Sequence, residues 1–288
     1  MTFPSTPAST IHDAHKGSIT VLCPNAAATY LLSAGVDRAI HLYNVSTHAR
    51  VQTYLLHASE VLALSINGES NGAQFASSGA DRNIFVWDTE RGVTTQRLRG
   101  HDAKVTCVEY GPQGVLFTGS FDGRVNVWDT RSRGYKPIQV LADARDGVTG
   151  LAVANPVVHV GSLDGALRSY DLRKGVITTD RVGAGVAGVT TVEAGTVLVS
   201  TLASELRLVD DAAGVIQRFA GHVNTEYLMR PSVVDMTVLA GSEDGRVYGW
   251  DLDGTPVGSV AGGVCVAGLD GTAYQFATGM SSGDIALY

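Results

Sequence analysis

Residues Val115–Asp129 read VLFTGSFDGRVNVWD, and this stretch decides the fold. Val115–Ser120 and the alternating run Val125–Trp128 each have the length and composition of a β-strand. Asp122-Gly123 stands between them, which is a strong hairpin signal because glycine adopts a positive φ at no steric cost. The stretch therefore predicts two antiparallel strands joined by a tight turn.

The same pattern returns about every forty residues along the chain. The residues that correspond to Trp128 in the successive repeats are Tyr43, Trp87, Trp128, Tyr170, Val209, Trp250 and Tyr288, at intervals of 44, 41, 42, 39, 41 and 38 residues. Six residues earlier lie Asp37, Asp81, Asp122, Asp164 and Asp244, with Ala203 and Ser282 in units five and seven. Further upstream lie His15, His57, His101 and His222. Seven repeats of short strands predict an all-β, seven-bladed β-propeller.

The chain ends indicate how the ring is closed. The sequence stops at the third strand of the seventh unit, whereas Ser9–Asp13 occupy the place of an outer strand before the first histidine. We therefore expect the N-terminal strand to complete the last blade, because a closed ring has no exposed sheet edges. The predicted organisation is a flexible segment, 1–8, followed by a single propeller, 9–288. No sustained helical period is present, so helices should be few.

The repeated polar residues predict one buried network in each unit. The turn aspartate accepts hydrogen bonds from turn amides and from the histidine, which in turn bonds a serine or threonine that reaches the tryptophan indole. The expected members are His57, Ser77, Asp81, Trp87, His101, Thr118, Asp122, Trp128, His222, Asp244 and Trp250. A hydrolase triad would be a single constellation with an oxyanion hole, so the repetition favours a structural role.

Composition restricts the possible partners. The net charge is −7 and the pI is about 5.6, which argues against a protein that binds a phosphate backbone. Cys23, Cys107 and Cys265 are odd in number and far apart, and we expect buried free thiols in a reducing compartment. Neither a signal peptide nor a long apolar run is visible. We therefore expect an intracellular protein, monomeric alone, that touches neither nucleic acid nor membrane directly.

Three apparent sites are better explained by the repeats. Gly183–Gly188 matches GxGxxG, but a strand-like run follows where a dinucleotide site needs a helix. Asp251–Gly254 resembles the start of a calcium loop, but Gly262 stands at the twelfth position instead of glutamate. His12, Asp13 and His15 fit the closing strand and first loop better than a metal site. We expect no catalytic residue, cofactor or metal.

Partner binding is expected on the rim where the histidine loops and aspartate turns converge. Large or charged residues beside these anchors are the candidates: Lys16, Asp102, Lys104, Phe121, Arg145, Asp146, Leu163, Asn224, Glu226, Tyr227 and Glu243. An aromatic at a turn tip, such as Phe121, is a common binding anchor. The alternative is that Phe121 and Leu163 fold over their own blades.

The chain closely resembles the WD-repeat family, and its second half is similar to one subfamily, the mitogen-activated protein kinase organisers. The similar stretches are Trp128–Arg133, Ala144–Val148, Gly161–Gly165, Tyr170–Arg173, Leu206–Leu208, Gly221-His222 and Glu226-Tyr227. Arg145–Gly147 is the best marker, since it replaces the usual Gly-His. The resemblance implies a non-catalytic scaffold of cytoplasm and nucleus that binds components of kinase cascades or spliceosomal proteins.

A second resemblance supports an alternative function. Trp128–Arg131 is similar to the WDxR signature by which some WD-repeat proteins bind the adaptor of a cullin-ring ubiquitin ligase, and Tyr170–Arg173 is a weaker match. The chain would then be a substrate receptor. An enzyme is the third and most distant interpretation, because no activated nucleophile or phosphate cradle is visible.

Overall fold

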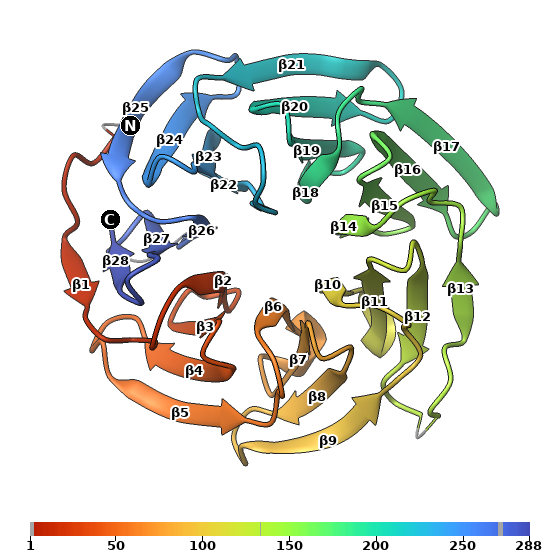
Figure 1. The fold of residues 1–288 in the computed structure, drawn as a ribbon, viewed down its shortest axis with the longest axis horizontal. Helices are drawn as coiled ribbons and strands as arrows, with labels where there is room; N and C mark the ends of the chain where they lie inside the picture. The colour runs from red at the N-terminus through yellow and green to blue at the C-terminus, as the bar shows by residue number, and fades with distance from the viewer. Residues whose placement is uncertain (1–2, 133, 270–272) are drawn as a thin grey trace.

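A computed structural model describes residues 3–132, 134–269 and 273–288, which form seven antiparallel sheets of four strands around a central opening (Figure 1). Each sheet is one blade, and its four strands are ordered from the central opening to the outside of the ring. This confirms the predicted all-β, seven-bladed propeller. The short helices of the described residues are the one-turn 3-10 segments η1 (Gly68–Ser70) and η2 (Pro112–Gly114). No helix in these ranges is long and apolar enough to span a membrane.

The first four blades follow the chain in order. Blade 1 holds β2 (Ile19–Pro24), β3 (Tyr30–Gly35), β4 (Ala39–Asn44) and β5 (Arg50–Leu55). Blade 2 holds β6 (Val61–Ile66), β7 (Gln74–Gly79), β8 (Ile84–Asp88) and β9 (Val93–Leu98). Blade 3 holds β10 (Val105–Tyr110), β11 (Val115–Ser120), β12 (Val125–Asp129) and β13 (Gln139–Leu141). Blade 4 holds β14 (Val148–Ala154), β15 (Val157–Ser162), β16 (Ala166–Asp171) and β17 (Val176–Arg181).

The remaining blades continue this order. Blade 5 holds β18 (Val186–Glu193), β19 (Thr196–Thr201), β20 (Glu205–Asp210) and β21 (Gly214–Ala220). Blade 6 holds β22 (Ser232–Val234), β23 (Thr237–Gly241), β24 (Arg246–Asp251) and β25 (Pro256–Ala261). Blade 7 holds β26 (Cys265–Gly268), β27 (Phe276–Gly279) and β28 (Ile285–Leu287), with β1 (Ser9–Ile11) as its outer strand.

The N-terminal strand closes the ring, as predicted. β1 pairs antiparallel with β28, with Thr10 opposite Ala286, and the N–H of Ala8 donates to the carbonyl of Leu287 at 2.8 Å. Figure 1 shows β1 on the outside of the blade that contains the last strands of the chain. The flexibility of segment 1–8 stays a prediction, and residues 1 and 2 lie outside the described ranges. Phe3 is half-buried against blades 6 and 7.

The core lies between neighbouring blades. Between blades 1 and 2, for example, Ile40 packs with Val61 and Phe75, and all three are fully buried. Close packing of such faces supplies most of the stabilisation of the ring.

Every junction between neighbouring blades also has a side-chain hydrogen bond near the central opening. The hydroxyls of Thr20, Thr106, Thr149 and Thr190 donate to carbonyls of the next blade, at Val61, Val148, Val186 and Pro231, over 2.5–2.7 Å. Ser65 and Ser232 accept from backbone N–H groups at Tyr110 and Gly268. At the closing junction the thiol of Cys265 faces the carbonyl of Ile19 at 3.7 Å.

Candidate functional site

Blades 2 and 3 contain the complete predicted network. In blade 2, His57 bonds Asp81 through Nδ1 at 3.1 Å and Ser77 through Nε2 at 2.8 Å. The indole of Trp87 donates to the Ser77 hydroxyl at 2.8 Å. Burial alone would raise the pKa of Asp81, but the bonds from His57 and the Ala58 N–H outweigh it and hold that pKa well below its usual range.

Blade 3 repeats this arrangement, as the spacing of the residues predicts. His101 bonds Asp122 at 2.9 Å and the Thr118 hydroxyl at 2.9 Å, and Trp128 donates to the same hydroxyl at 2.9 Å. The buried polar atoms satisfy one another and fix the loop before β10 against the turn after β11.

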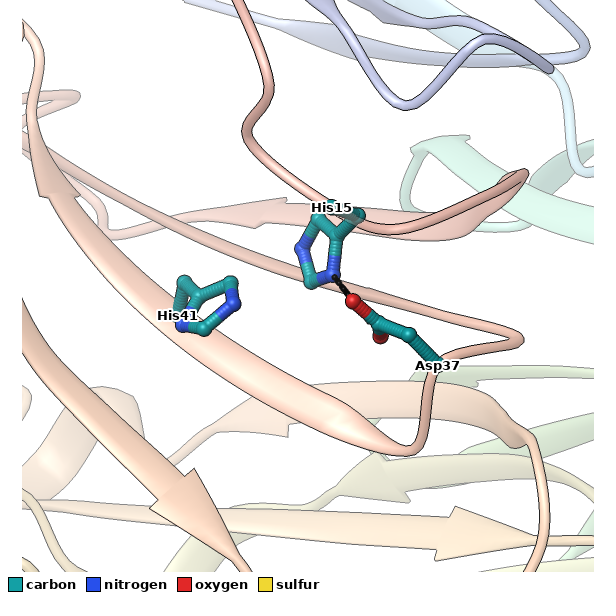
Figure 2. Close-up of side chains that lie close together, drawn as sticks. All are labelled: His15, Asp37 and His41. Carbon is teal, nitrogen blue, oxygen red and sulfur yellow. Dashed lines mark hydrogen bonds and ion pairs between the residues drawn. The ribbon is translucent and has the colours of Figure 1, made fainter.

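Blade 1 has a related cluster that contains a second histidine (Figure 2). His15 bonds Asp37 at 3.0 Å and Ser33 at 2.8 Å, and the ring of His41 lies 4.5 Å from the His15 ring. Burial lowers the pKa of His41 to about 4, so this ring is neutral near pH 7. Tyr43 replaces tryptophan and donates to a backbone carbonyl instead.

The three side chains of Figure 2 offer ligand atoms within 4.8 Å of one another, which raises the question of a metal ion. Both ring nitrogens of His15 already have protein partners, and Nδ1 of His41 bonds the Thr53 hydroxyl at 3.0 Å. In blade 2 the same His–Asp pair carries Phe85 in place of His41, with its ring 4.7 Å from that of His57. The cluster is therefore explained by packing. His12, by contrast, lies beside Asp284 at 3.7 Å.

The predicted hydrogen-bonded network of His222, Asp244 and Trp250 in blade 6 is wrong. His222 is buried, yet neither of its ring nitrogens has a hydrogen-bond partner among the described residues. Asp244 accepts from the Tyr248 hydroxyl at 2.7 Å, and the indole of Trp250 donates to the carbonyl of Ala220 at 3.2 Å. The cause is Ala240, which occupies the strand position of Ser77 and Thr118 and has no hydroxyl. Sequence inspection of that strand position could have revealed this.

Blade 4 replaces the histidine with an arginine. Arg168 of β16 holds the Asp164 carboxylate through two nitrogens, at 2.6 and 3.2 Å, and the N–H of Arg145 donates to it at 3.0 Å. Burial would raise the pKa of Asp164, but the bonds from Arg168 and Arg145 lower it to about 2. Blade 4 has Arg145–Gly147 where other blades have Gly-His, and Arg168 of the same blade takes over the hydrogen bonds to the turn aspartate that the histidine makes elsewhere.

These networks lie at one end of the ring, which we call the loop rim. It is formed by the turns between the second and third strands of the blades and by the loops before the innermost strands, β2, β6, β10, β14, β18, β22 and β26. Antiparallel pairing places all candidate binding residues at this end. Six of them are exposed: Lys16, Asp102, Arg145, Asp146, Glu226 and Tyr227. Their side chains form no part of the buried networks and face solvent, with Asp102 beside the Arg124 guanidinium at 3.7 Å.

Two candidate residues are structural, which corrects the prediction. Asn224 is fully buried, and its side-chain amide donates to the Ser200 hydroxyl at 3.0 Å. The carboxylate of Glu243 accepts from the N–H groups of Thr225 and Glu226 at 2.7 Å. These bonds hold the pKa of Glu243 at about 2, against a burial effect of opposite sign. Both side chains anchor the loop before β22.

Three further candidates are half-buried. The ammonium of Lys104 lies 3.9 Å from the ring centroid of Phe121, a cation–π contact, and the Phe121 ring lies against Gly147 of the next blade. The Leu163 side chain approaches Gly185 of blade 5. Phe121 and Leu163 thus contact the following blade and not only their own.

Sequence reasoning missed part of the loop before β22, His222–Pro231, which we call the blade-6 strap. It exposes Val223, Tyr227 and Leu228 by 42%, 60% and 37%, three apolar side chains within six residues. Its Arg230 donates to Glu109 of blade 3 at 3.1 Å and to Thr190 of blade 5 at 3.3 Å. Because β10 and β22 lie across the central opening from each other (Figure 1), this ion pair spans the opening.

The WDxR signature lies at the opposite rim, after β12. The Arg131 side chain is 61% exposed, and its guanidinium pairs with Asp129 of the same turn at 3.0 Å. Arg133, the last residue of the similar stretch, lies outside the described ranges. Gly183 and Gly185 of the GxGxxG match lie between β17 and β18, so a strand follows, as predicted. The three cysteines are free.

Comparison with known proteins agrees with this geometry. The profile of the WD domain, G-beta repeat, matches residues 6–44, 49–88 and 92–129. An uncharacterised WD repeat-containing protein of Schizosaccharomyces pombe is 37% identical over 83% of this chain and 81% of its own. Human WD repeat domain-containing protein 83 is 35% identical over 83% and 77%. The U5 small nuclear ribonucleoprotein 40 kDa protein of Dictyostelium discoideum is 29% identical over 55% and 45%. Seven blades, their buried networks and these relatives establish that the chain belongs to the WD-repeat proteins.

Proposed function

We propose that this chain is a non-catalytic scaffold that binds other proteins through its loop rim, in kinase-cascade or pre-mRNA splicing complexes of cytoplasm and nucleus. The observation that carries the proposal is the exposure of the Arg145 and Tyr227 side chains on loops whose backbone is held by hydrogen bonds. The N–H of Arg145 donates to Asp164, and the N–H of Tyr227 donates to Glu243. Rigid loops lose little entropy on binding, which favours a preformed interface.

Two kinds of similarity support the choice of pathway. The stretch Ala144–Val148 resembles the kinase organisers, and its Arg145 and Asp146 are exposed on the loop rim. One relative is named as a protein of the U5 small nuclear ribonucleoprotein, which supports spliceosomal partners. The strap adds an apolar surface of Val223, Tyr227 and Leu228 beside charged groups, a combination common at protein interfaces.

A double replacement tests the loop rim. Tyr227→Ala with Arg145→Glu removes an exposed aromatic and reverses an exposed charge, and neither side chain belongs to a buried network. Affinity purification with mass spectrometry should recover kinase or splicing partners at least tenfold less efficiently, since hot-spot truncations cost more than about 2 kcal/mol of binding. Thermal unfolding should change by less than about 0.5 kcal/mol.

The matched control is Arg131→Glu on the opposite rim, and it also tests the ligase alternative. Arg131 is as exposed as Tyr227, and the alternative needs its guanidinium. Under our proposal Arg131→Glu retains all partners. Loss of a ubiquitin-ligase adaptor with Arg131→Glu, and intact partners with the loop-rim variant, would replace the scaffold proposal by the substrate-receptor function.

A further inference from the structure

The recess between blades 6 and 7 has the shape of an aromatic side chain. In blades 1–3 the residue directly before Tyr43, Trp87 or Trp128 packs against the next blade. These residues are Leu42, Val86 and Val127. The matching residue of blade 6 is Gly249, which pairs with Gly258 of the outer strand. A Cβ on either glycine would collide with the ring of Phe3, so the two glycines leave a space that this ring fills.

The other walls of the recess favour an aromatic occupant. The rings of Phe3 and Phe276 are stacked, with centroids 5.8 Å apart, and Phe276 in turn stacks on Tyr288 at 4.8 Å. The rest of the lining is formed by Val234, Leu239 and Val257 with the polar residues Thr237 and Gln275. Offset stacking adds stabilisation beyond that of buried area, and an aliphatic side chain cannot supply it.

Among residues 3–8, Phe3 and Pro4 are half-buried, and the Phe3 ring is the side chain seen to fill the recess. Residues 5–8 are exposed, and no hydrogen bond fixes residues 3–7 among the described residues; the first is that of the Ala8 N–H. Ordering these residues costs conformational entropy that opposes the burial of one ring. Pro4 keeps the residue before it extended, so the backbone is extended at Phe3, and bends follow at Ser5 and Thr6.

We propose that this recess is a binding site for an aromatic residue of a peptide that is extended at that residue, occupied in this chain by its own Phe3. A partner segment of the same chemistry displaces the N-terminal segment and binds at the rim opposite the loop rim. The proposal is independent of the loop-rim function. A short tether gives the internal segment an effective concentration of about millimolar, which the partner must overcome.

The test uses the full-length chain with Phe3→Ala and a fluorescein-labelled peptide of residues 2–9, TFPSTPAS. Fluorescence anisotropy should show saturable binding at least tenfold tighter than to the wild-type chain, whose recess is filled. A peptide with leucine in place of phenylalanine should bind several-fold more weakly, because it cannot stack on Phe276. Equal binding to both chains, or none to either, would overturn the proposal.

A filled recess provides the matched control. Phe3→Ala with Gly249→Val places a valine where blades 2 and 3 have Val86 and Val127, and it should abolish peptide binding. Peptide binding to this double variant would overturn the site assignment. In the otherwise wild-type chain, 4-fluorophenylalanine at position 3 reports exchange directly by fluorine NMR. Excess peptide must convert the buried resonance into an exposed one, and an unchanged resonance would contradict displacement.

Discussion

Ala240 shows how one side chain decides whether a blade has its polar network. It occupies the strand position of Ser77 and Thr118, and without a hydroxyl both nitrogens of His222 stay unpaired within the described structure. A buried, unpaired polar atom costs about 1–3 kcal/mol. Blade 6 therefore folds with an unpaired buried histidine, whereas the histidines of blades 2 and 3 are hydrogen-bonded.

We predict that Ala240→Ser stabilises the protein. The new hydroxyl would lie where Ser77 bonds His57 and Trp87, so His222 and Trp250 gain a common partner. The free energy of unfolding should rise by about 0.5–1.5 kcal/mol in urea titration. Thr118→Ala is the reciprocal control and should lower it by at least as much. A neutral or destabilising Ala240→Ser would mean that His222 cannot reach the new hydroxyl.

Several residue roles were readable from the sequence, and others were not. The spacing of His57, Asp81 and Trp87 predicts their network, because a fixed strand register places them together. The burial of Asn224 could not be read, since it depends on Ser200 of another blade. Position alone suggested that Glu243 is free, whereas its carboxylate caps the backbone of the strap.

At the scale of elements, the innermost strands are joined to their neighbours by side-chain hydrogen bonds, and the junction that closes the ring has the weakest of these. The Cys265 thiol lies 3.7 Å from the Ile19 carbonyl, whereas Thr20, Thr106 and Thr149 make this contact at 2.5–2.6 Å. A thiol is a weak hydrogen-bond donor. This side-chain contact is therefore weaker between blades 7 and 1 than between blades 3 and 4, and the backbone N–H groups of His15 and Ile19 add bonds to the carbonyls of Gly283 and Met280.

Cys265→Thr should strengthen the closing junction. Threonine at this position would donate to Ile19 as Thr106 donates to Val148, and the expected gain in unfolding free energy is about 0.5–1.5 kcal/mol. Thr106→Cys is the matched control at a junction inside the chain and should cost a similar amount. Hydrogen exchange of the β26 amides should slow with Cys265→Thr. Faster exchange there would show that the extra methyl group is not accommodated.

For the whole molecule, closure depends on β1, whose three residues complete blade 7. Deletion of residues 1–13 would expose the edge of β28, and unpaired edges promote aggregation. We expect an insoluble or loosely packed protein, measured by light scattering and near-ultraviolet circular dichroism. Deletion of residues 1–7 alone removes Phe3 but keeps β1, so it should remain monomeric and folded. A monomeric 1–13 deletion with unchanged thermal unfolding would contradict the role of β1.

The pairing of β1 with β28 also determines when the ring can close during translation. Among the strands of the propeller, β1 leaves the ribosome first and finds its partner last, because the other blades must be translated before Ile285–Leu287 emerge. At about 5–20 residues per second, β1 waits on the order of 15–60 s. Throughout that interval the growing arc of blades has two open ends. Chaperones that cover strand edges during translation are therefore expected to act on this protein mainly before its last blade is synthesised.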